Sequence, residues 1–289
     1  MSENSSFIKP FLVDNLSVNG KIIHLEDSVA KIISQHNYPD DISKLLSEIL
    51  VFVSMLGHNM KSSAIVTCQV SSKDSIIKLL VADYLLDDKG EVFLRGYSEF
   101  DQDKFNLAID KSFKHLVKDA TMMITIDLAG EHSKRYQGIV DIKGDDLASA
   151  VTEYMKSSQQ IDAKIQISSK KSSDGSWKAG GIIIQKLPAK EGVEESEDNW
   201  DKAESFVSTI TKEELLLEDI TTDILLYRLF HEDEVYLYDE TKVMHKCRCS
   251  RERMSRSIDA IPENERDSLK IDGLIAIKCQ FCGKEEYFE

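Results

Sequence analysis

Four of the five cysteines lie in the last forty-three residues, in two close pairs. The first pair is Cys247-Arg248-Cys249, and the second, after twenty-nine intervening residues, is Cys279-Gln280-Phe281-Cys282. Two thiol pairs at this spacing converge on one tetrahedral ion, and Zn²⁺ is the ion that such a set selects when no iron–sulfur pattern is present. Because four sulfurs leave no open coordination position, we expect one Zn²⁺ that stabilises the fold and takes no part in catalysis.

The C-x-C half of this pattern is unusual. Structural zinc sites normally separate two cysteines by about two to four residues, whereas one intervening residue brings Cys247 and Cys249 close enough to form a small, strained disulfide if the metal leaves. The neighbours Lys246, Arg248 and Arg251 are basic, which favours thiolates and makes them reactive towards oxidants. The spacing leaves two interpretations open, an inert zinc ribbon and a redox-sensitive zinc site.

Two further side chains bear on this site. Cys68 ends the apolar run Ile65-Val66-Thr67-Cys68, which predicts a buried thiol in the core. His245 lies two residues before Cys247 and is either a further ligand or a surface histidine. The predicted metal ligands are therefore Cys247, Cys249, Cys279 and Cys282.

Length and composition limit the class of protein. The chain has 289 residues, which suits two domains or one large domain with an appendage, and 42% of them are hydrophobic, which is enough for a core. The segment Met1 to Lys9 has no apolar signal region, and no apolar stretch is long enough to span a membrane. We expect a cytoplasmic protein without a membrane partner, in a reducing compartment where clustered cysteines bind metal or sense oxidants. The net charge of −15 disfavours nucleic acid as a partner, because phosphates would repel most of the surface.

The charge is unevenly distributed along the chain. Residues 191–240 contain seventeen acidic and three basic side chains, a balance of −14, whereas residues 245–256 contain five basic residues and one acidic residue. One interpretation is a solvated helical face followed by a surface loop. The other is an acidic segment that repels itself and is supported by the basic cysteine module after it. We predict the second arrangement, in which residues 200–230 are ordered only while the zinc module is folded.

Residues 1–187 predict an α+β domain. After Tyr38-Pro39-Asp40, apolar residues recur at three and four positions, which predicts a helix to about Met60, and a second helix is expected from Leu147 to Met155. Because hairpins join most of the strands, we expect a mixed, largely antiparallel sheet with helices packed against it. The predicted strands are Ile65 to Val70, Ile76 to Ala82, Met122 to Leu128, Arg135 to Ile142 after a turn around Gly130, Ile161 to Ser169, and Trp177 to Leu187.

A polar, acidic run from Pro188 to Asn199 opens a helical linker, residues 188–232. In the linker, Ala203, Phe206, Val207 and Ile210 have helical spacing, and Thr211-Lys212-Glu213-Glu214 matches a capping box. The simplest arrangement docks these helices permanently on the sheet domain. The alternative is that their apolar faces become exposed on demand.

Residues 233–289 predict a small C-terminal zinc module. Apolar positions are few in this part of the chain, so it is marginal without a covalent or metal cross-link. Zn²⁺ on four thiolates contributes about 10–16 kcal/mol, which is comparable to the total stability of about 5–15 kcal/mol of an ordinary domain. We therefore expect removal of the metal to unfold this module.

Three segments of the second half resemble one family. Residues 225–232 read LLYRLFHE, residues 247–253 read CRCSRER, and residues 279–283 read CQFCG. Together they closely resemble the redox-regulated 33 kDa heat-shock chaperone family, whose zinc centre has a C-x-C, a long spacer and a C-x-x-C. Similar segments in the first half extend the resemblance to essentially the whole chain: residues 11–13, 16–18, 95–97, 135–140 and 154–161.

This resemblance implies a stress-response holdase chaperone that needs no ATP. The reduced form would bind zinc and be inactive. The oxidised form would contain Cys247–Cys249 and Cys279–Cys282 disulfides, release zinc, unfold its zinc module and linker, dimerise and bind unfolding client proteins. The residues agree with this on their own, because the tail depends on metal, the acidic linker has apolar faces, and no glycine-rich phosphate loop is visible.

A function of another class is thiol–disulfide exchange by an oxidoreductase that uses Cys279 and Cys282. Such a C-x-x-C normally sits at a helix N-terminus after a strand in a thioredoxin-like unit, and it lies here too near the end of the sequence for that unit. A zinc-ribbon adaptor for nucleic acid is opposed by the acidic balance. We therefore expect a chaperone and not an enzyme.

Overall fold

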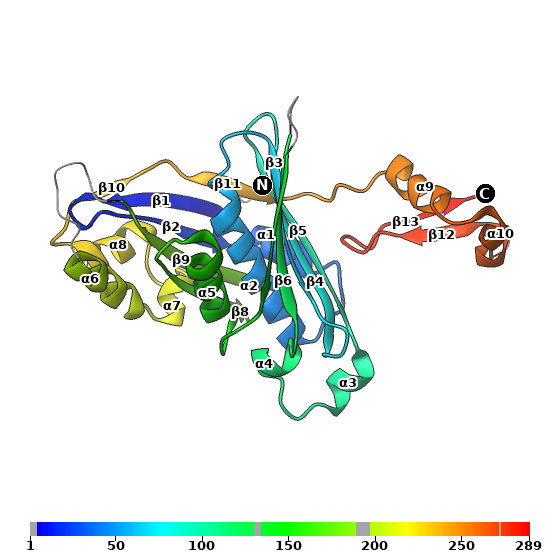
Figure 1. Ribbon diagram of the computed structural model, residues 1–289, viewed down its shortest axis with the longest axis horizontal. Coiled ribbons are helices and arrows are strands. Elements are labelled where there is room, and N and C mark those ends of the chain that lie inside the picture. Colours follow the sequence, from blue (N-terminus) through cyan, green and yellow to red (C-terminus); the bar gives the residue numbers. More distant parts are fainter. Residues whose placement is uncertain (1–4, 130–133, 189–196, 272) are drawn as a thin grey trace.

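The computed structural model describes residues 5–129, 134–188, 197–271 and 273–289. A long sheet bends around one central helix (Figure 1). Among the described residues, neighbouring strands are antiparallel except for β11 and β5, which are parallel, and β10 (Val235–Leu237) pairs beside the main path with β1. In order across the sheet, the strands are β7 (Arg135–Asp141), β6 (Thr121–Leu128), β3 (Ala64–Ser71), β4 (Ile77–Leu86), β5 (Val92–Phe100), β11 (Thr241–His245), β1 (Phe7–Val13), β2 (Val18–Leu25), β9 (Trp177–Lys186) and β8 (Ala163–Lys171).

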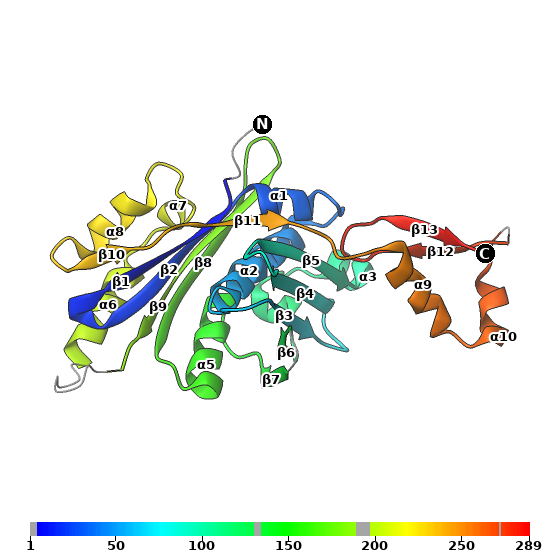
Figure 2. The ribbon, with the colours of Figure 1, turned by 90° about the horizontal axis from the view of Figure 1, so that it is seen from above.

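The central helix is α2 (Asp40–Gly57), which packs against strands of both halves of the sheet (Figure 2). Asp40 and Asp41 in its first turn favour the helix start, because carboxylates interact well with the N-terminal dipole. Nearly every later side chain is buried, as expected for a helix enclosed on all sides. The other helices of this part are α1 (Asp27–Ile33), α3 (Gln102–Leu107), α4 (Phe113–Leu116) and α5 (Leu147–Gln159).

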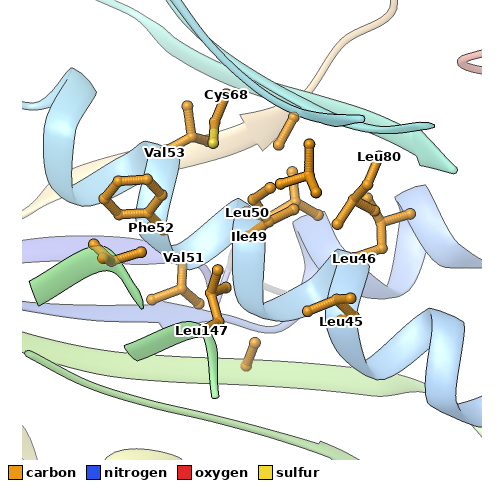
Figure 3. Close-up of a cluster of buried hydrophobic side chains, with 14 of the residues drawn as sticks. Leu45, Leu46, Ile49, Leu50, Val51, Phe52, Val53, Cys68, Leu80 and Leu147 are labelled. Carbon is orange, nitrogen blue, oxygen red and sulfur yellow. The ribbon is translucent and has the colours of Figure 1, made fainter. Parts of the chain in front are cut away.

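The main core surrounds α2. Cys68 from β3 and Leu80 from β4 lie on one side of the helix, and Leu147 from α5 lies on another side (Figure 3). Cys68 is fully buried, and this burial raises the pKa of its thiol. The predicted role of Cys68 as a core thiol is confirmed.

The linker forms α6 (Glu197–Ser208), α7 (Lys212–Leu215) and α8 (Thr222–Phe230). The predicted capping box is confirmed, because the Glu214 amide donates to Thr211 Oγ1 and the Thr211 amide donates to the Glu214 carboxylate. These helices cover the outer face of β1, β2 and β9 and form a second core there. Its buried sheet side chains are Phe11, Val13, Val18, Ile22, Ile182 and Ile184, and its buried linker side chains are Ala203, Val207, Ile210, Leu215, Leu225, Leu226, Leu229 and Phe230.

The C-terminal module lies at the opposite end of the molecule from α6–α8 in both views (Figure 1, Figure 2). It consists of α9 (Arg251–Asp259), α10 (Glu263–Arg266) and a hairpin of β12 (Ile275–Lys278) and β13 (Glu285–Phe288). The predicted support of the acidic linker by direct contact with this module is therefore wrong. The linker packs on the sheet, which offers it a continuous apolar face.

The α+β class with a largely antiparallel sheet is confirmed. The predicted strands and helices are present within a few residues. The strands β1, β2, β5 and β10 to β13 and the helices α1, α3, α4, α9 and α10 were not predicted. The predicted turn at Gly130 and most of the run from Pro188 to Asn199 lie outside the described residues. The domain boundaries at 187 and 232 stay predictions, and β10 and β11, which follow the second boundary, pair with the sheet.

Candidate metal and thiol centre

The two cysteine pairs meet at the base of the C-terminal module. Cys247 and Cys249 follow β11, and Cys279 and Cys282 lie in the turn between β12 and β13. All four Sγ atoms lie within 4.8 Å of one another. Cys247 Sγ is 3.6 Å from Cys279 Sγ, and Cys249 Sγ is 3.5 Å from Cys282 Sγ. The residues predicted as ligands are thus brought together by two distant segments of the chain.

This geometry fits a tetrahedral metal site. Four sulfurs at about 2.3 Å from a central Zn²⁺ lie about 3.8 Å from one another, close to the two distances above. Burial acts to raise the pKa of Cys247, but hydrogen bonds from the Cys249 amide and the neighbouring thiols outweigh it and hold this pKa below its usual value. Burial and neighbouring thiols raise the pKa of Cys249. Ionisation of one thiol therefore makes ionisation of its neighbours less favourable. A bound divalent cation would offset the repulsion between the thiolates.

Local sequence explains how the cysteines are positioned. In the hairpin turn, the Cys279 amide donates to the Lys284 carbonyl and the Gly283 amide donates to the Cys279 carbonyl, both at 2.8 Å. Gly283 has a φ of 70°, which glycine adopts without steric cost. On the other segment, Ser250 caps α9 by accepting a hydrogen bond from the Arg253 amide.

Two of the basic residues near the cysteines, Arg251 and Arg253, hold the module itself together. Arg251 donates to the Glu286 carboxylate at 2.7 Å and to the Tyr287 carbonyl at 2.9 Å, and Arg253 donates to the Arg248 carbonyl at 2.9 Å. His245 lies on β11 with its Nε2 2.8 Å from Gln35 Nε2. The four cysteines form the candidate metal cluster without this histidine, within the part of the chain that the structure describes.

Phe281 docks the C-x-x-C turn onto the sheet domain. Its ring lies edge-on to Tyr97, with centroids 4.7 Å apart, and the Arg95 guanidinium lies 3.8 Å above its centroid. The His36 ring nitrogen lies 3.1 Å from the Phe281 carbonyl, and Arg95 is itself paired with the buried Asp83. The thiol cluster is therefore attached directly to β5 through Phe281, one of the two residues between Cys279 and Cys282.

At the end of the molecule far from the cysteines, acidic side chains of the linker form ion pairs with lysines of β8 and β9. Glu218 lies 3.1 Å from Lys170 and 2.8 Å from Lys178, and hydrogen bonds from these two lysines hold the pKa of Glu218 below its usual value. Lys164 pairs with Glu204 at 3.2 Å. The acidic side chains of the linker therefore form ion pairs with these lysines and not with the basic residues near the cysteines.

Close backbone packing also fixes the linker. A Cβ atom at Gly180 of β9 would lie 2.0 Å from the Leu215 carbonyl oxygen and 2.9 Å from its carbonyl carbon. The end of α7 therefore rests on the sheet at a position that accepts glycine and excludes any side chain. The sequence signal for this contact is the Gly180-Gly181 pair within a strand, which suggests a close backbone approach.

Comparison with known proteins places this arrangement in a family. A family model described as Hsp33 protein matches residues 6–289. The chain belongs to the Hsp33 family. It is 30% identical over 290 residues to a 33 kDa chaperonin of Pseudomonas fluorescens (strain SBW25), covering 99% of this chain and 91% of that one. It is 32% identical over 279 residues to a 33 kDa chaperonin of Salmonella typhi, covering 96% and 90%.

A solved structure supports the Hsp33 fold. The crystal structure of the 33 kDa chaperonin (heat shock protein 33 homolog) from Thermotoga maritima superposes with a TM-score of 0.81. The match covers 98% of this chain and 94% of that chain, at 17% sequence identity. The two proteins therefore share the whole fold.

Two observations bear on the other function classes. Cys279 and Cys282 lie in a turn between two strands, whereas a thioredoxin-like motif sits at a helix N-terminus. In the described part of this Hsp33 chain, no helix is both long enough and apolar enough to cross a membrane.

Proposed function

We propose that this protein is a redox-regulated holdase chaperone that needs no ATP. The observation that carries this is the covered apolar face on β1, β2 and β9. Acidic helices that cover it continue through two short strands into a cluster of four thiols. The chain thus links a large apolar surface to a chemically sensitive site.

In the reduced state, Cys247, Cys249, Cys279 and Cys282 would hold one Zn²⁺ as thiolates. The bound ion supplies a structural cross-link and no catalysis, because four sulfurs fill a tetrahedral site. Phe281 then stays on Arg95 and Tyr97. The linker helices stay on the sheet, and client proteins have no access to the apolar face.

Oxidation by peroxide would convert the thiolates to disulfides. In each pair, two thiolates give two electrons to one hydrogen peroxide molecule, which takes up two protons and leaves as two water molecules. We propose the pairs Cys247–Cys249 and Cys279–Cys282. The sulfurs then no longer bind the ion as thiolates, and the module loses its main stabilising interaction.

The change would reach the linker through β11 and β10. β11 ends two residues before Cys247, and β10 follows α8. Asn15 holds the segment between α8 and β10, because its side chain donates to Asp233 and accepts from the Glu234 amide. Loss of the module removes one anchor of this connection, and the linker helices then leave the face of β1, β2 and β9.

The exposed face would bind unfolding proteins, since large apolar surfaces associate with non-native chains. A linker that becomes disordered adapts to many client surfaces. We also propose a homodimer for the oxidised form, and a cytoplasmic location, where a resting thiol state is maintained.

Aggregation of a chemically unfolded client, followed by light scattering, tests this function. The oxidised protein should suppress scattering, and the reduced and re-reduced forms should not. Insulin reduction, run on the same samples, should stay at background if the C-x-x-C pair does not act as an oxidoreductase. Equal suppression by the oxidised and reduced forms would overturn redox control.

We expect the reduced protein to bind one zinc per chain. Replacing two ligands, Cys279→Ser with Cys282→Ser, should abolish tight binding because two thiolates cannot close the site. Elemental analysis after dialysis measures this directly. Cys68→Ala is the matched control, since this thiol lies in the core and its loss should leave the zinc content at one. Full zinc retention in the double variant would exclude the proposed ligands.

Phe281→Ala should lower the oxidant dose that activates the protein. The ring makes one aromatic contact and one cation–π contact, each worth about 0.5–2 kcal/mol, and neither involves a sulfur atom. Zinc content should therefore stay at one while the module separates from β5. Phe288→Ala is the control, because the Phe288 ring packs on Arg251 within the module. An unchanged dose–response curve for Phe281→Ala would show that docking on β5 does not restrain the linker.

A further inference from the structure

Strand β11 joins the two halves of the bent sheet (Figure 2). Its residues 241–242 pair antiparallel with residues 7–8 of β1, and its residues 243–245 pair in parallel with residues 92–94 of β5. One short extended segment therefore forms backbone hydrogen bonds with the edges of two different strands, β1 and β5. We call the place that it fills the β11 seat.

The side chains of β11 that point into the protein define what the seat accepts. Val243 is completely buried and belongs to the main core around α2. On either side of it, Thr241 Oγ1 lies 3.1 Å from His58 Nε2 at the end of α2, and His245 Nε2 lies 2.8 Å from Gln35 Nε2 just after α1. The seat thus holds one β-branched apolar residue between two polar residues, at alternate positions of an extended chain.

Among the strands of the main sheet, β11 is the nearest to the thiols along the chain. A single residue, Lys246, separates it from Cys247, and Lys242 on the strand is exposed. The module beyond it rests on the same strand β5 that pairs with β11, through Phe281 on Arg95 and Tyr97. Unfolding of the module therefore removes the anchor at the C-terminal end of β11 and uncovers the adjoining part of β5 at the same time.

We propose that the β11 seat is a client-binding site in the oxidised protein, where an extended segment of an unfolded chain replaces β11 by strand addition. This rests on the proposed holdase function and adds a second mode of binding to the apolar face of β1, β2 and β9. Backbone hydrogen bonds to residues 7–8 of β1, to the Ser6 carbonyl before it and to residues 92–94 of β5 supply affinity for any extended chain. The pocket of Val243 supplies a preference for β-branched apolar residues.

An unfolded client fits the seat better than the strand that leaves it. β11 stops at His245, because the residues after it turn away to form the thiol cluster. In the described residues, no strand pairs with this edge of β5 beyond Leu94, and Phe281 packs on the side chains of Arg95 and Tyr97 there. Once Phe281 has left, a client segment continues along β5 past Leu94 to Arg95 and Gly96, so it pairs with a longer part of β5 than β11 does. The added pairing ends before Ser98, because the Tyr38 hydroxyl bonds both the amide and the carbonyl of Ser98.

A labelled peptide with the sequence of residues 240–246, ETKVMHK, tests the proposal by fluorescence anisotropy. It should bind the oxidised full-length protein at least tenfold more tightly than the reduced protein, in which β11 occupies the seat. A Val243→Asp peptide should bind at least tenfold more weakly than the parent peptide. A Lys242→Ala peptide is the matched control and should bind as the parent does, because this side chain points to solvent.

Aggregation suppression, measured on the same oxidised sample, separates this proposal from the proposed function. Suppression with no peptide binding, or equal binding to both redox forms, overturns the seat and leaves the holdase function intact. Peptide binding that competes with an unfolded client supports it. A photo-crosslink from position 243 of one copy into the seat of a second copy would assign the seat to dimer formation and also overturn the proposal. If the oxidised protein does not suppress aggregation at all, both the β11 seat and the holdase function are overturned.

Discussion

Gly180→Ala should make the reduced, zinc-loaded protein an active holdase. The added Cβ would lie 2.0 Å from the Leu215 carbonyl oxygen, and Gly180 is fixed on β9 between β2 and β8, so α7 has to move. Such overpacking costs about 1–3 kcal/mol, which shifts linker docking by roughly 5- to 150-fold towards the undocked state. Light scattering in reductant, with zinc content measured on the same sample, checks this result.

Gly181→Ala is the matched control for this experiment. Its Cβ would point to the opposite face of β9, 2.8 Å from the side chains of Val51 and Met55 on α2. This variant should lower the melting temperature and leave the linker docked. If both variants gained the same activity, general destabilisation and not release of the linker would explain it. A reduced Gly180→Ala protein that is inactive would show that contact with α7 does not control the apolar face.

Removal of zinc under reducing conditions should unfold the C-terminal module and leave the sheet domain folded. The module has one hairpin, short helices and few buried apolar side chains, while a tetrathiolate zinc site contributes about 10–16 kcal/mol. The main core around α2 is independent of the cysteine cluster. A chelator with reductant, followed by proteolysis and mass spectrometry, should therefore cut first within residues 247–289.

Zinc added back to the chelated protein is the control, and it should restore resistance to proteolysis. The Cys68→Ala protein should respond in the same way as the parent, because the buried thiol takes no part in the site. A module that resists proteolysis equally with and without metal would mean that its own packing is sufficient. The proposed switch would then lack its driving force.

Much of the fold was predictable from local patterns. The α2 helix, the β3–β4 pair and the β8–β9 hairpin follow from apolar periodicity and turn residues close in sequence. β11 was not predictable in this way. Its five residues include one fully buried side chain, Val243, and its pairing with β1 and β5 depends on segments more than a hundred residues away.

In the candidate site, too, features that depend on nearby residues were predictable and contacts between distant segments were not. The cysteine spacing predicted the cluster of four thiols, because the ligands of a zinc site come in pairs that are close in sequence. The docking of Phe281 on Arg95 and Tyr97 joins two distant segments, and nothing near Phe281 in the sequence marks it as an interface residue. The charge pattern predicted the basic residues beside the cysteines as the partners of the acidic linker, and this was wrong. Its partners include Lys170 and Lys178, which could be found only from the sheet.

Hydrogen exchange across residues 200–230 tests the central claim most directly, which is that the thiol state controls the linker from the far end of the molecule. In the reduced, zinc-bound protein, amides of α6 and α8 should be protected, because Val207, Leu225 and Leu229 are buried against the sheet. After peroxide treatment, protection there should be lost, while α2 keeps its own. Equal protection of residues 200–230 in the two states would contradict the account, even if zinc binding by the four cysteines were confirmed.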